Sequence, residues 1–591
     1  MTTPRELLAR YVTQSQMSSF FIDKMGIINV KSYGAKGDGV TDDTVALMAA
    51  FASGYTYFYF PSGTYLIHLT EGFPLVTFTG LDHIYIMGNN AVIRDTTIYT
   101  GGAAAPLFLF NNCFDVLVEG IDYLGNALAN PAIDLGYYGA TFVRAINGTE
   151  RVRVRAKLEH CRYGVHTGSY VTVSEGNCKN FDIDLVTSYV GYPVALYLAE
   201  DVKAKIISEY TRRAAYLAGI VGGDIDVQFK NGYVANVQVL LTDAKSGTGT
   251  SRGCKDVRVR SQDMGSTVYI ANTYCAGLAL SRVDPGIEYS NIDIHFSVRS
   301  TDTIASTVGG VIIASAVKSV LPEYPFNWEQ TIVLKNIRIR GLVDRSGQTV
   351  AGNLDGDMAI RTFDSGEHYA TVYNFINDGI TILPTSGTNN VCIFHLPGLQ
   401  DNMTFLNCNF SGVPMELYAN QISEVCFVNS KLLYTSSLSN EASKISLINT
   451  SVSNIVNQPL TNVSVFNSPI NSAGVFIKAR TTELTLSGAT TTWTVGIPAG
   501  LLLGVSGVVT TLITGASGYQ VGVSGDAARF ADMNTLTVGA QFTPANQAVT
   551  ETFPRFYSTA TNVVVTAKTS NFTGGKLRLF LTYIAYAAPA N

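Results

Sequence analysis

The chain has 591 residues, of which 46% are hydrophobic and only 14% charged, with 54 glycines and a net charge of −5. This balance favours an extended, β-rich protein of about two to four domains and excludes nucleic acid as an expected partner. No apolar run reaches the roughly 18–20 residues of a membrane span, and the start lacks the apolar core of a signal peptide.

The eight cysteines form no C-x-x-C or other zinc spacing. We expect them to be reduced, buried, small hydrophobic residues. The sequence therefore predicts synthesis in a reducing compartment without a classical export signal, and it demands neither a metal ion nor a cofactor.

A short helical segment is predicted at the N-terminus, within residues 1–27. Thr3 and Glu6 can form a capping box, Pro4 suits the first helical turn, and Gly26 can end the helix. The apolar face of residues 4–25 needs a partner, so we expect this segment to dock on copies of itself or on another protein.

The stretch YGAKGDGVTDDT, residues 33–44, opens a predicted cap over residues 28–75. It lacks the ligand pattern of a calcium-binding loop and the G-K-[ST] of a phosphate loop. We expect a helix that starts with Thr41 or Asp42 as its N-cap and covers the first coil of the domain that follows. Its predicted apolar face is Val45, Leu47, Met48 and Phe51.

Short alternating strands recur from about residue 80 onward, each followed by a polar turn and a second apolar strand. The clearest are RVRVRAKL from Arg151, FDIDLV from Phe181, DVKAKII from Asp201, DIDVQF from Asp224, DVRVR from Asp256, NIDIHFSV from Asn291 and NIRIR from Asn336. Units that recur every 20–45 residues or so are the signature of a solenoid. The fold class is therefore predicted to be all-β, a right-handed parallel β-helix over residues 28–473.

Four late repeats share one asparagine at the same place, and about twenty residues separate each from the next. These residues are Asn407, Asn429, Asn449 and Asn467. Asparagine tolerates left-handed backbone angles at a bend and can hydrogen-bond to its neighbours along a stack. We interpret them as structural.

Residues 474–591 differ from the repeats in composition and pattern, with more glycine and threonine and with strands that lack the repeat. Evenly spaced antiparallel strands with turn signals predict a separate β-sandwich or jelly-roll-like domain. Its expected role is trimerisation, carbohydrate binding or both.

The segment VKSYGAKGDGVTDDTVAL followed by YFPSGTYLI resembles the start of pectate-lyase-like β-helices. That superfamily includes pectin-active enzymes, epimerases and bacteriophage tailspikes that degrade bacterial surface polysaccharides. The order of helix, β-helix and C-terminal β-domain resembles a phage tailspike depolymerase in particular. The resemblance implies a virion protein, made in the host cytoplasm, that acts at the bacterial surface.

Aligned repeats place charged side chains in two outward ladders whose sign alternates from coil to coil. Opposite charges on adjacent strands are favourable and like charges are not. The ladder positions are Arg153 and Arg155, Asp182 and Asp184, Lys203 and Lys205, Asp224 and Asp226, Arg258 and Arg260, Asp293 and His295, and Arg338 and Arg340. We interpret these carboxylates as cross-coil partners before we consider any as catalytic.

The turns that end these strands are the preferred place for chemistry. The same alignment puts Glu159 and Glu209 at equal heights two coils apart, with Ser188 and Tyr189 on the coil between them. Inverting glycosidases hold two carboxyl groups about 6.5–9.5 Å apart. The predicted catalytic pair is therefore Glu159 and Glu209, and their alternative role is as solvated turn residues paired with nearby arginines.

The residues near these turns suit an acidic sugar, because arginine can form two hydrogen bonds to a carboxylate and an aromatic ring can stack on the sugar face. The expected substrate-binding residues are His160, Arg162, Tyr189, Tyr210, Arg212, Arg213 and Tyr233. The next candidates are Glu200, Asp201, Asp243 and Asp263.

Three functions stay open. The chain could cleave a bacterial polysaccharide by hydrolysis, or by elimination at a uronic acid with His160, Arg212 and Tyr210 supplying the cation and the base. It could also be a receptor-binding fibre without catalysis, or a bacterial pectin-type enzyme. We expect a homotrimer, because open β-helix ends and flat sheets need cover, with the N-terminal segment attaching it to the phage tail or an adaptor.

Overall fold

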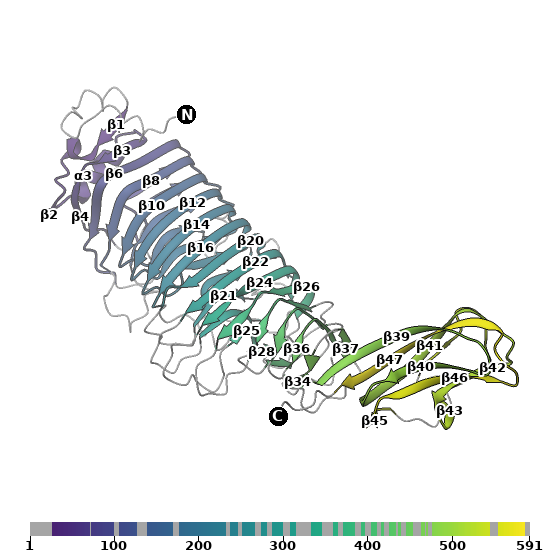
Figure 1. The fold of residues 1–591 in the computed structure, drawn as a ribbon. Helices are drawn as coiled ribbons and strands as arrows, with labels where there is room; N and C mark the ends of the chain where they lie inside the picture. The colour runs from purple at the N-terminus through teal and green to yellow at the C-terminus, as the bar shows by residue number, and fades with distance from the viewer. Residues whose placement is uncertain are drawn as a thin grey trace, which may run out of the picture. The chain divides into compact units, whose positions relative to one another are not determined.

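A computed structural model gives the fold of the chain (Figure 1). It describes residues 26–70, 72–99, 106–126, 139–168, 177–231, 237–245, 251–265, 273–279, 287–299, 308–314, 332–344, 358–363, 370–383, 392–395, 403–410, 415–418, 425–432, 435–438, 445–452, 463–466, 469–470, 475–543 and 553–585. They fall into two compact units, residues 1–425 with 437–443, and residues 426–436 with 444–591.

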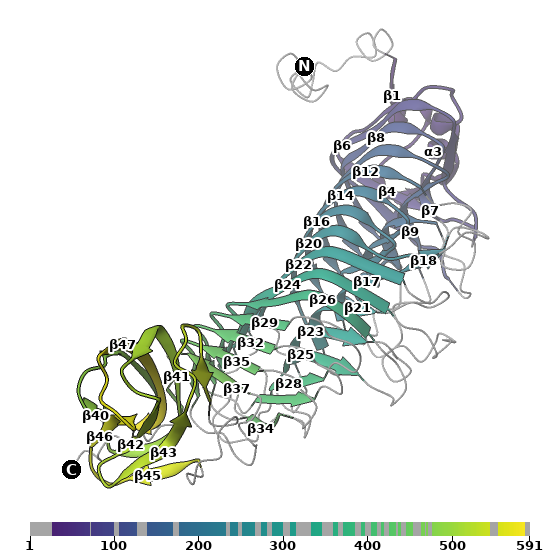
Figure 2. The same ribbon diagram turned by 90° about the vertical axis from the view of Figure 1, so that its right-hand side faces the viewer.

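The first unit is a parallel β-helix built on one long sheet, here called sheet A. Its main strands are β6 (Asp82–Asp95), β8 (Phe114–Leu124), β10 (Glu150–Glu159), β12 (Lys179–Ser188), β14 (Glu200–Glu209), β16 (Val221–Lys230), β20 (Lys255–Asp263), β22 (Ile287–Arg299), β24 (Ile332–Asp344) and β26 (Ala370–Asp378). Each pairs in parallel with the next, so consecutive coils stack (Figures 1 and 2). The predicted β-helix is confirmed, and each quoted strand lies within one of these strands.

A second parallel stack, sheet B, follows the turn at the end of each sheet A strand. Its strands are β5 (Val76–Thr79), β7 (Pro106–Asn111), β9 (Thr141–Ile146), β11 (Tyr163–Thr167), β13 (Tyr192–Tyr197), β15 (Ala215–Ala218), β17 (Val237–Thr242), β21 (Thr273–Ala279), β23 (Val308–Ala314) and β25 (Met358–Phe363). Strands β13, β15 and β17 are buried along their whole length. Inward residues of both sheets, such as Val152 and Val194, form the core.

The N-terminal cap contains the helix α3 (Thr44–Phe51), the strands β1 (Ile27–Asn29), β2 (Asp38–Asp42), β3 (Tyr57–Phe60) and β4 (Gly63–Ile67), and the 3₁₀ turn η1 (Val30–Tyr33). Phe51 closes the core because its ring packs 4.8 Å from Phe58 and 6.0 Å from Phe108. The predicted covering role of the helix is thus confirmed.

Two details of the cap helix differ from the prediction. The N-cap residue is Asp43, whose buried carboxylate accepts hydrogen bonds from the backbone N–H groups of Lys36 and Gly37 instead of from the helix. Val45 is 79% exposed and Met48 44%, because the short helix buries only the face that carries Leu47 and Phe51. The loop is therefore folded around Asp43, as scaffold.

Residues in the left-handed region form a column at the start of sheet A. His83, Asp115, Arg151, Asn180, Asp201, Asp256, Asn291, Asn336 and Asn374 all have φ between 53° and 58°. Asparagine side chains hydrogen-bond along this column, from Asn291 to Asp256 at 2.7 Å and from Asn336 to Asn291 at 3.0 Å. The left-handed backbone predicted for the late repeats is confirmed at Asn407, Asn429 and Asn449, and Asn467 lies outside the described residues.

The second unit holds the last short coils and an antiparallel domain. In the coils, β35 (Ile445–Ile448) pairs with β37 (Val463–Phe466), and Asn449 donates to Asn429 at 3.3 Å. One antiparallel sheet contains β39 (Val475–Thr485), β41 (Gly500–Thr514) and β47 (Gly574–Ala585). The other contains β40 (Thr490–Ile497), β42 (Gly518–Val523), β43 (Asp526–Met533) and β46 (Thr561–Lys568). The two sheets share one hydrophobic core, so the predicted sandwich is confirmed.

Two further expectations can be checked within the described part of the chain. Cys113, Cys161, Cys178, Cys254 and Cys408 are buried free thiols, as predicted, and Cys426 is half-buried. None of the described helices has the length and apolar character needed to cross a membrane.

Candidate functional site

Glu159 and Glu209 end strands β10 and β14 in the same register. Glu159 pairs with Ser188 of β12, and Ser188 pairs with Glu209. The two glutamates are thus two strands apart, about 9.6 Å between backbones at the usual strand spacing. The small serine is the residue between them, and the predicted alignment of the three turns is confirmed.

Both carboxylates are partly exposed and each has a lysine nearby. Lys157 lies 2.8 Å from Glu159, whose side chain is 34% exposed. Lys230 lies 3.9 Å from Glu209, which is 43% exposed, and Asn231 donates a hydrogen bond to Glu209 at 3.4 Å. The lysine contact of Glu159 is the tighter of the two, so the two glutamates have different surroundings.

His160, Tyr189 and Tyr210 follow these strand ends as a stack of three rings. All three have left-handed backbone angles, with φ of 53°, 53° and 51°. The rings are nearly parallel, with centroids 4.9 Å apart for His160 and Tyr189 and 4.7 Å for Tyr189 and Tyr210. Burial, Tyr210 and Glu209 raise the pKa of Tyr189. Because both faces of Tyr189 are covered, a sugar cannot stack on it as expected, and only ring edges and the hydroxyl remain.

The predicted arginines lie at different depths. The Arg162 guanidinium, on a half-buried residue, is 4.9 Å from the centre of the Tyr163 ring. Arg212 is buried beside Tyr192, at 5.7 Å. Arg213 is only 2% exposed and its Nε donates to the Val237 carbonyl, so its expected contact with a polysaccharide is corrected to a structural role. Tyr233 lies outside the described residues.

Sequence reasoning missed an aromatic cluster on sheet B just beyond this turn. Tyr163 stacks on Tyr192 at 5.3 Å and on His166 at 4.5 Å, and Tyr197 lies 5.4 Å from Tyr216. Burial, Arg144 and Arg162 lower the pKa of His166 to about 3, so its ring is neutral at physiological pH. Counting four residues on from Glu159 and Ser188 would have found the first two tyrosines.

The other acidic candidates have structural surroundings. Glu200 forms ion pairs with Lys179 at 3.1 Å and Arg252 at 3.0 Å, which lower its pKa. Asp243 and Asp263 are buried, and Asp201 belongs to the left-handed column. None of these four lies in the register position shared by Glu159 and Glu209.

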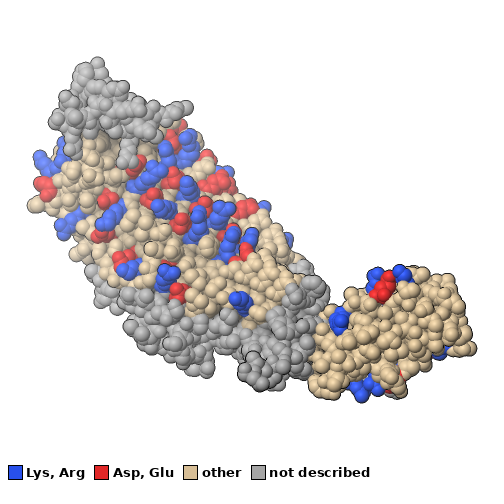
Figure 3. Space-filling model, viewed as in Figure 1, with Lys and Arg blue, Asp and Glu red and all other residues tan. Residues whose placement is uncertain are grey.

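The charge ladders have the predicted register on the outer face of sheet A (Figure 3). Ion pairs join neighbouring coils, from Arg155 to Asp182 at 3.3 Å and from Arg260 to Asp224 at 3.5 Å. This face also carries a shallow depression of about 270 Å³. It is lined by Arg155, Asp182, Ile183, Asp184, Lys203, Ala204, Lys205, Asp224, Asp226 and Arg260.

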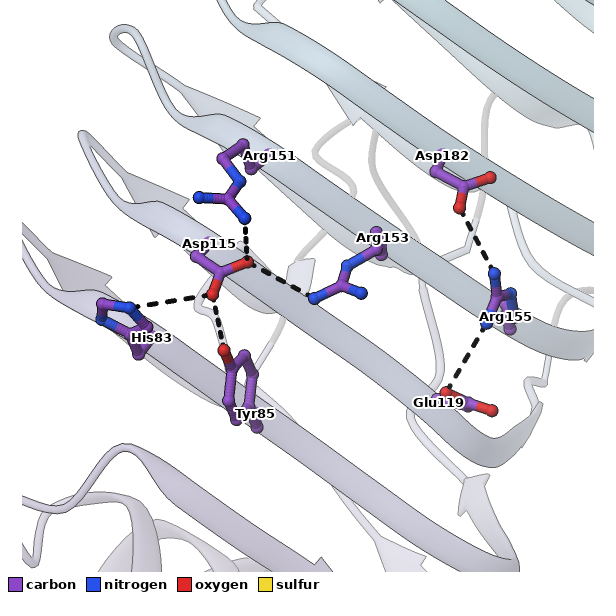
Figure 4. A network of polar contacts seen from close by, with 8 residues as sticks. All are labelled: His83, Tyr85, Asp115, Glu119, Arg151, Arg153, Arg155 and Asp182. Carbon is purple, nitrogen blue, oxygen red and sulfur yellow. Dashed lines mark hydrogen bonds and ion pairs between the residues drawn. The ribbon is translucent and has the colours of Figure 1, made fainter. Parts of the chain in front are cut away.

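Another polar network lies near the N-terminal coils and centres on Asp115 (Figure 4). Tyr85 donates to Asp115 at 2.5 Å, and Arg153, Arg151 and His83 lie 3.4–3.9 Å from the same carboxylate. Burial and Asp115 raise the pKa of Tyr85 to about 12, so the phenol stays protonated and acts as a hydrogen-bond donor. This network links strands β6, β8 and β10.

Comparison with known proteins adds one family match. Residues 27–104 match the model of the family described as "Rhamnogalacturonase A/epimerase, pectate lyase-like". Residues 27–104 are here called the pectate-lyase-like segment, after this match. The resemblance predicted from the motifs of the cap is thus confirmed for the pectate-lyase-like segment. A search of curated proteins found no match to the chain.

Several solved structures are similar to the chain at low identity. The surface adhesin PfbA of Streptococcus pneumoniae is 10% identical, with a TM-score of 0.34 over 75% of this chain and 90% of the adhesin. A tailspike protein of E. coli bacteriophage HK620, in complex with a pentasaccharide, is 10% identical, with a TM-score of 0.29 over 98% of both chains. The A-module of the Azotobacter vinelandii mannuronan C-5 epimerase AlgE6 is 14% identical, with a TM-score of 0.25 over 75% of this chain and 99% of the module. These values assign no activity.

Proposed function

We propose that the chain is a phage tailspike that binds and depolymerises a bacterial surface polysaccharide, such as a capsule, an exopolysaccharide or an O-antigen. The observation that carries this proposal is the register of Glu159, Ser188 and Glu209, which sets two carboxylates on either side of a small residue. The pectate-lyase-like segment supports a carbohydrate-active scaffold.

The proposed reaction is hydrolysis of a glycosidic bond by a general acid and a general base. Backbones about 9.6 Å apart allow the carboxyl groups to reach the roughly 6.5–9.5 Å separation that leaves room for the attacking water. Glu159, in the tighter ion pair with Lys157, is the proposed base that activates water. Glu209 is then the acid that protonates the leaving oxygen. Ser188 and the hydroxyls of Tyr189 and Tyr210 lie beside this pair, and they are the groups proposed to hydrogen-bond to the sugar hydroxyls.

Two alternatives use the same surface. A lyase would remove a proton beside a uronate, with Tyr210 or His160 as base, and would need no second carboxylate. A receptor-binding fibre would hold the polymer and leave it intact. Arg212, one of the three residues expected to supply the cation and the base of a lyase, is buried beside Tyr192, so the hydrolase is favoured.

The test is to incubate the protein with purified surface polysaccharides from a panel of bacteria and to measure chain length. We expect one polysaccharide to shorten, with new reducing ends and no absorbance from an unsaturated uronate. An absorbing product would replace hydrolase with lyase. Binding with unchanged chain length across the panel would leave only the receptor-binding fibre.

The proposed assembly is a C3 homotrimer in the virion. Residues 1–27 are proposed to attach it to the phage tail or an adaptor protein, residues 28–473 to form the polysaccharide-active β-helix, and residues 474–591 to join the subunits, bind carbohydrate or both. Side-by-side association of the subunits would cover sheet surfaces that could otherwise associate with other chains. Light scattering on the intact chain at micromolar concentration should give three times the mass of one chain, and a monomer would contradict this.

A further inference from the structure

Six coils of sheet A each present two outward side chains of one sign, and a seventh presents Asp293 together with His295. The sign of these charges changes from one coil to the next. These rows, here called the charged face, are Arg153 and Arg155, Asp182 and Asp184, Lys203 and Lys205, Asp224 and Asp226, Arg258 and Arg260, Asp293 and His295, and Arg338 and Arg340. We propose that the charged face takes no part in subunit contacts and stays open to solvent and polymer in the trimer. This inference rests on the trimer of the proposed function.

A threefold axis relates subunits by rotation alone, so equivalent coils of parallel β-helices lie at equal heights. If the charged faces met around such an axis, Arg153 and Arg155 would face their own copies, and so would Asp182 and Asp184. Like charges that face each other across an interface repel, and here the repulsion would recur on coil after coil.

A different face of the neighbouring subunit is also a poor cover for the charged face. Several cations of the charged face already pair with carboxylates on the adjacent coil. Such pairs are Arg155 with Asp182 at 3.3 Å, Arg260 with Asp224 at 3.5 Å and Arg340 with Asp293 at 2.6 Å. Burying this surface would desolvate every row or break these pairs, and interface cores are depleted in charged residues for that reason.

The depression in the charged face would then be open to a polymer. Its lining carries carboxylates of two rows and cations of the rows beside them, so it offers both donors and acceptors to sugar hydroxyls. Ser188 and Glu209 lie further along the same outward faces of β12 and β14 as Asp184 and Lys205. A polymer lying on the charged face would therefore lead directly to the proposed catalytic turn.

The test is thiol accessibility in the intact oligomer. Lys205→Cys and, on another row, Arg258→Cys are treated with a bulky maleimide-polyethylene glycol. Wild type, whose described cysteines are mostly buried, gives the background, and denatured protein gives the unprotected rate. We expect both new thiols to react as fast as in denatured protein, with no loss of trimer by light scattering.

Protection of both thiols in an intact trimer would overturn the inference, and so would release of monomers on coupling. A wild-type chain that is monomeric would also overturn it. Because coupling is read without a substrate, absence of depolymerisation would refute the proposed activity and leave this result standing. The second variant covers the case in which one substitution fails to fold.

Discussion

At the residue scale, the structure separates carboxylates that support the fold from carboxylates that are open to chemistry. Asp43, Asp95 and Asp115 are buried and accept hydrogen bonds that fix turns or neighbouring strands. Glu159 and Glu209 have partly exposed side chains at a strand end, each beside a lysine. Carboxylates of the second kind can meet a polymer and exchange protons with it, whereas the buried carboxylates cannot.

Asp95 should be critical for stability. Its carboxylate accepts the Thr97 backbone N–H at 2.8 Å and the hydroxyls of Tyr99 and Tyr123 at 2.7 and 2.8 Å. Asp95→Ala leaves these buried donors without a partner, at about 1–3 kcal/mol for each group. We expect a clearly lower apparent unfolding temperature at one scan rate, whereas Asp82→Ala, at an exposed position of the same strand, should change it little.

Glu200 should make stability depend on acid. Its pKa is lowered from 4.5 by Lys179 and Arg252. A lowered folded-state pKa means that the stabilisation is present above the ordinary value and is lost as the pH falls through the folded value. Wild type should therefore lose more stability than Glu200→Gln between neutral pH and about pH 3, measured by chemical denaturation. Equal losses in the two proteins would contradict the ion-pair role.

At the element scale, much of the fold could be predicted because one coil is one repeat. Period-two alternation predicted the strands, and the alignment of the repeats predicted the register from Arg153 to Arg338. The same count placed Glu159 and Glu209 in one column. It could not show that Arg213 turns inward or that Tyr189 is covered on both faces, because those depend on side-chain packing across coils. The N-cap of the cap helix was predicted wrongly because the Asp43 carboxylate binds backbone N–H groups of the loop before the helix.

Asn291 tests the left-handed column. Ala at φ 55° is disfavoured by roughly 1–2 kcal/mol, whereas glycine accepts that angle. Both Asn291→Gly and Asn291→Ala lose the hydrogen bond that Asn291 donates to Asp256 and the one that it accepts from Asn336. We expect the alanine variant to be less stable by about 1 kcal/mol or more. If the two variants unfold alike, the backbone angle is not what selects asparagine there.

Asp293 tests the charge ladder. It lies between Arg258 and Arg338 in register and pairs with Arg340. Asp293→Lys would set cations on three adjacent strands, which should lower stability more than Asp293→Asn does. Because salt screens exposed charges, the difference between the two variants should shrink as ionic strength rises. A difference that does not depend on salt would point to packing instead of charge.

At the scale of the whole molecule, the stacked coils bring outward residues together only where they occupy equivalent positions in neighbouring coils. A catalytic site on this fold must be built from such positions. The pectate-lyase-like segment closes one end of the β-helix, and the coils beyond it repeat with different outward residues. Like-charged rows are proposed to keep the charged face free of subunit contacts, and the strand ends of β10 and β14 carry the proposed acid and base. The scaffold and the proposed chemistry thus use different columns of the same coils.

The most direct measurement is the chain length of a susceptible polysaccharide after incubation with wild type, Glu159→Gln, Glu209→Gln and the control Glu150→Gln. Glu150 lies at the opposite end of strand β10 from Glu159. Loss of a general acid or base typically costs about 10²–10⁴ in rate. We predict that wild type and Glu150→Gln shorten the polymer, whereas the other two variants fold, bind and leave its length nearly unchanged. Full cleavage by folded Glu159→Gln or Glu209→Gln would contradict the assignment of this pair.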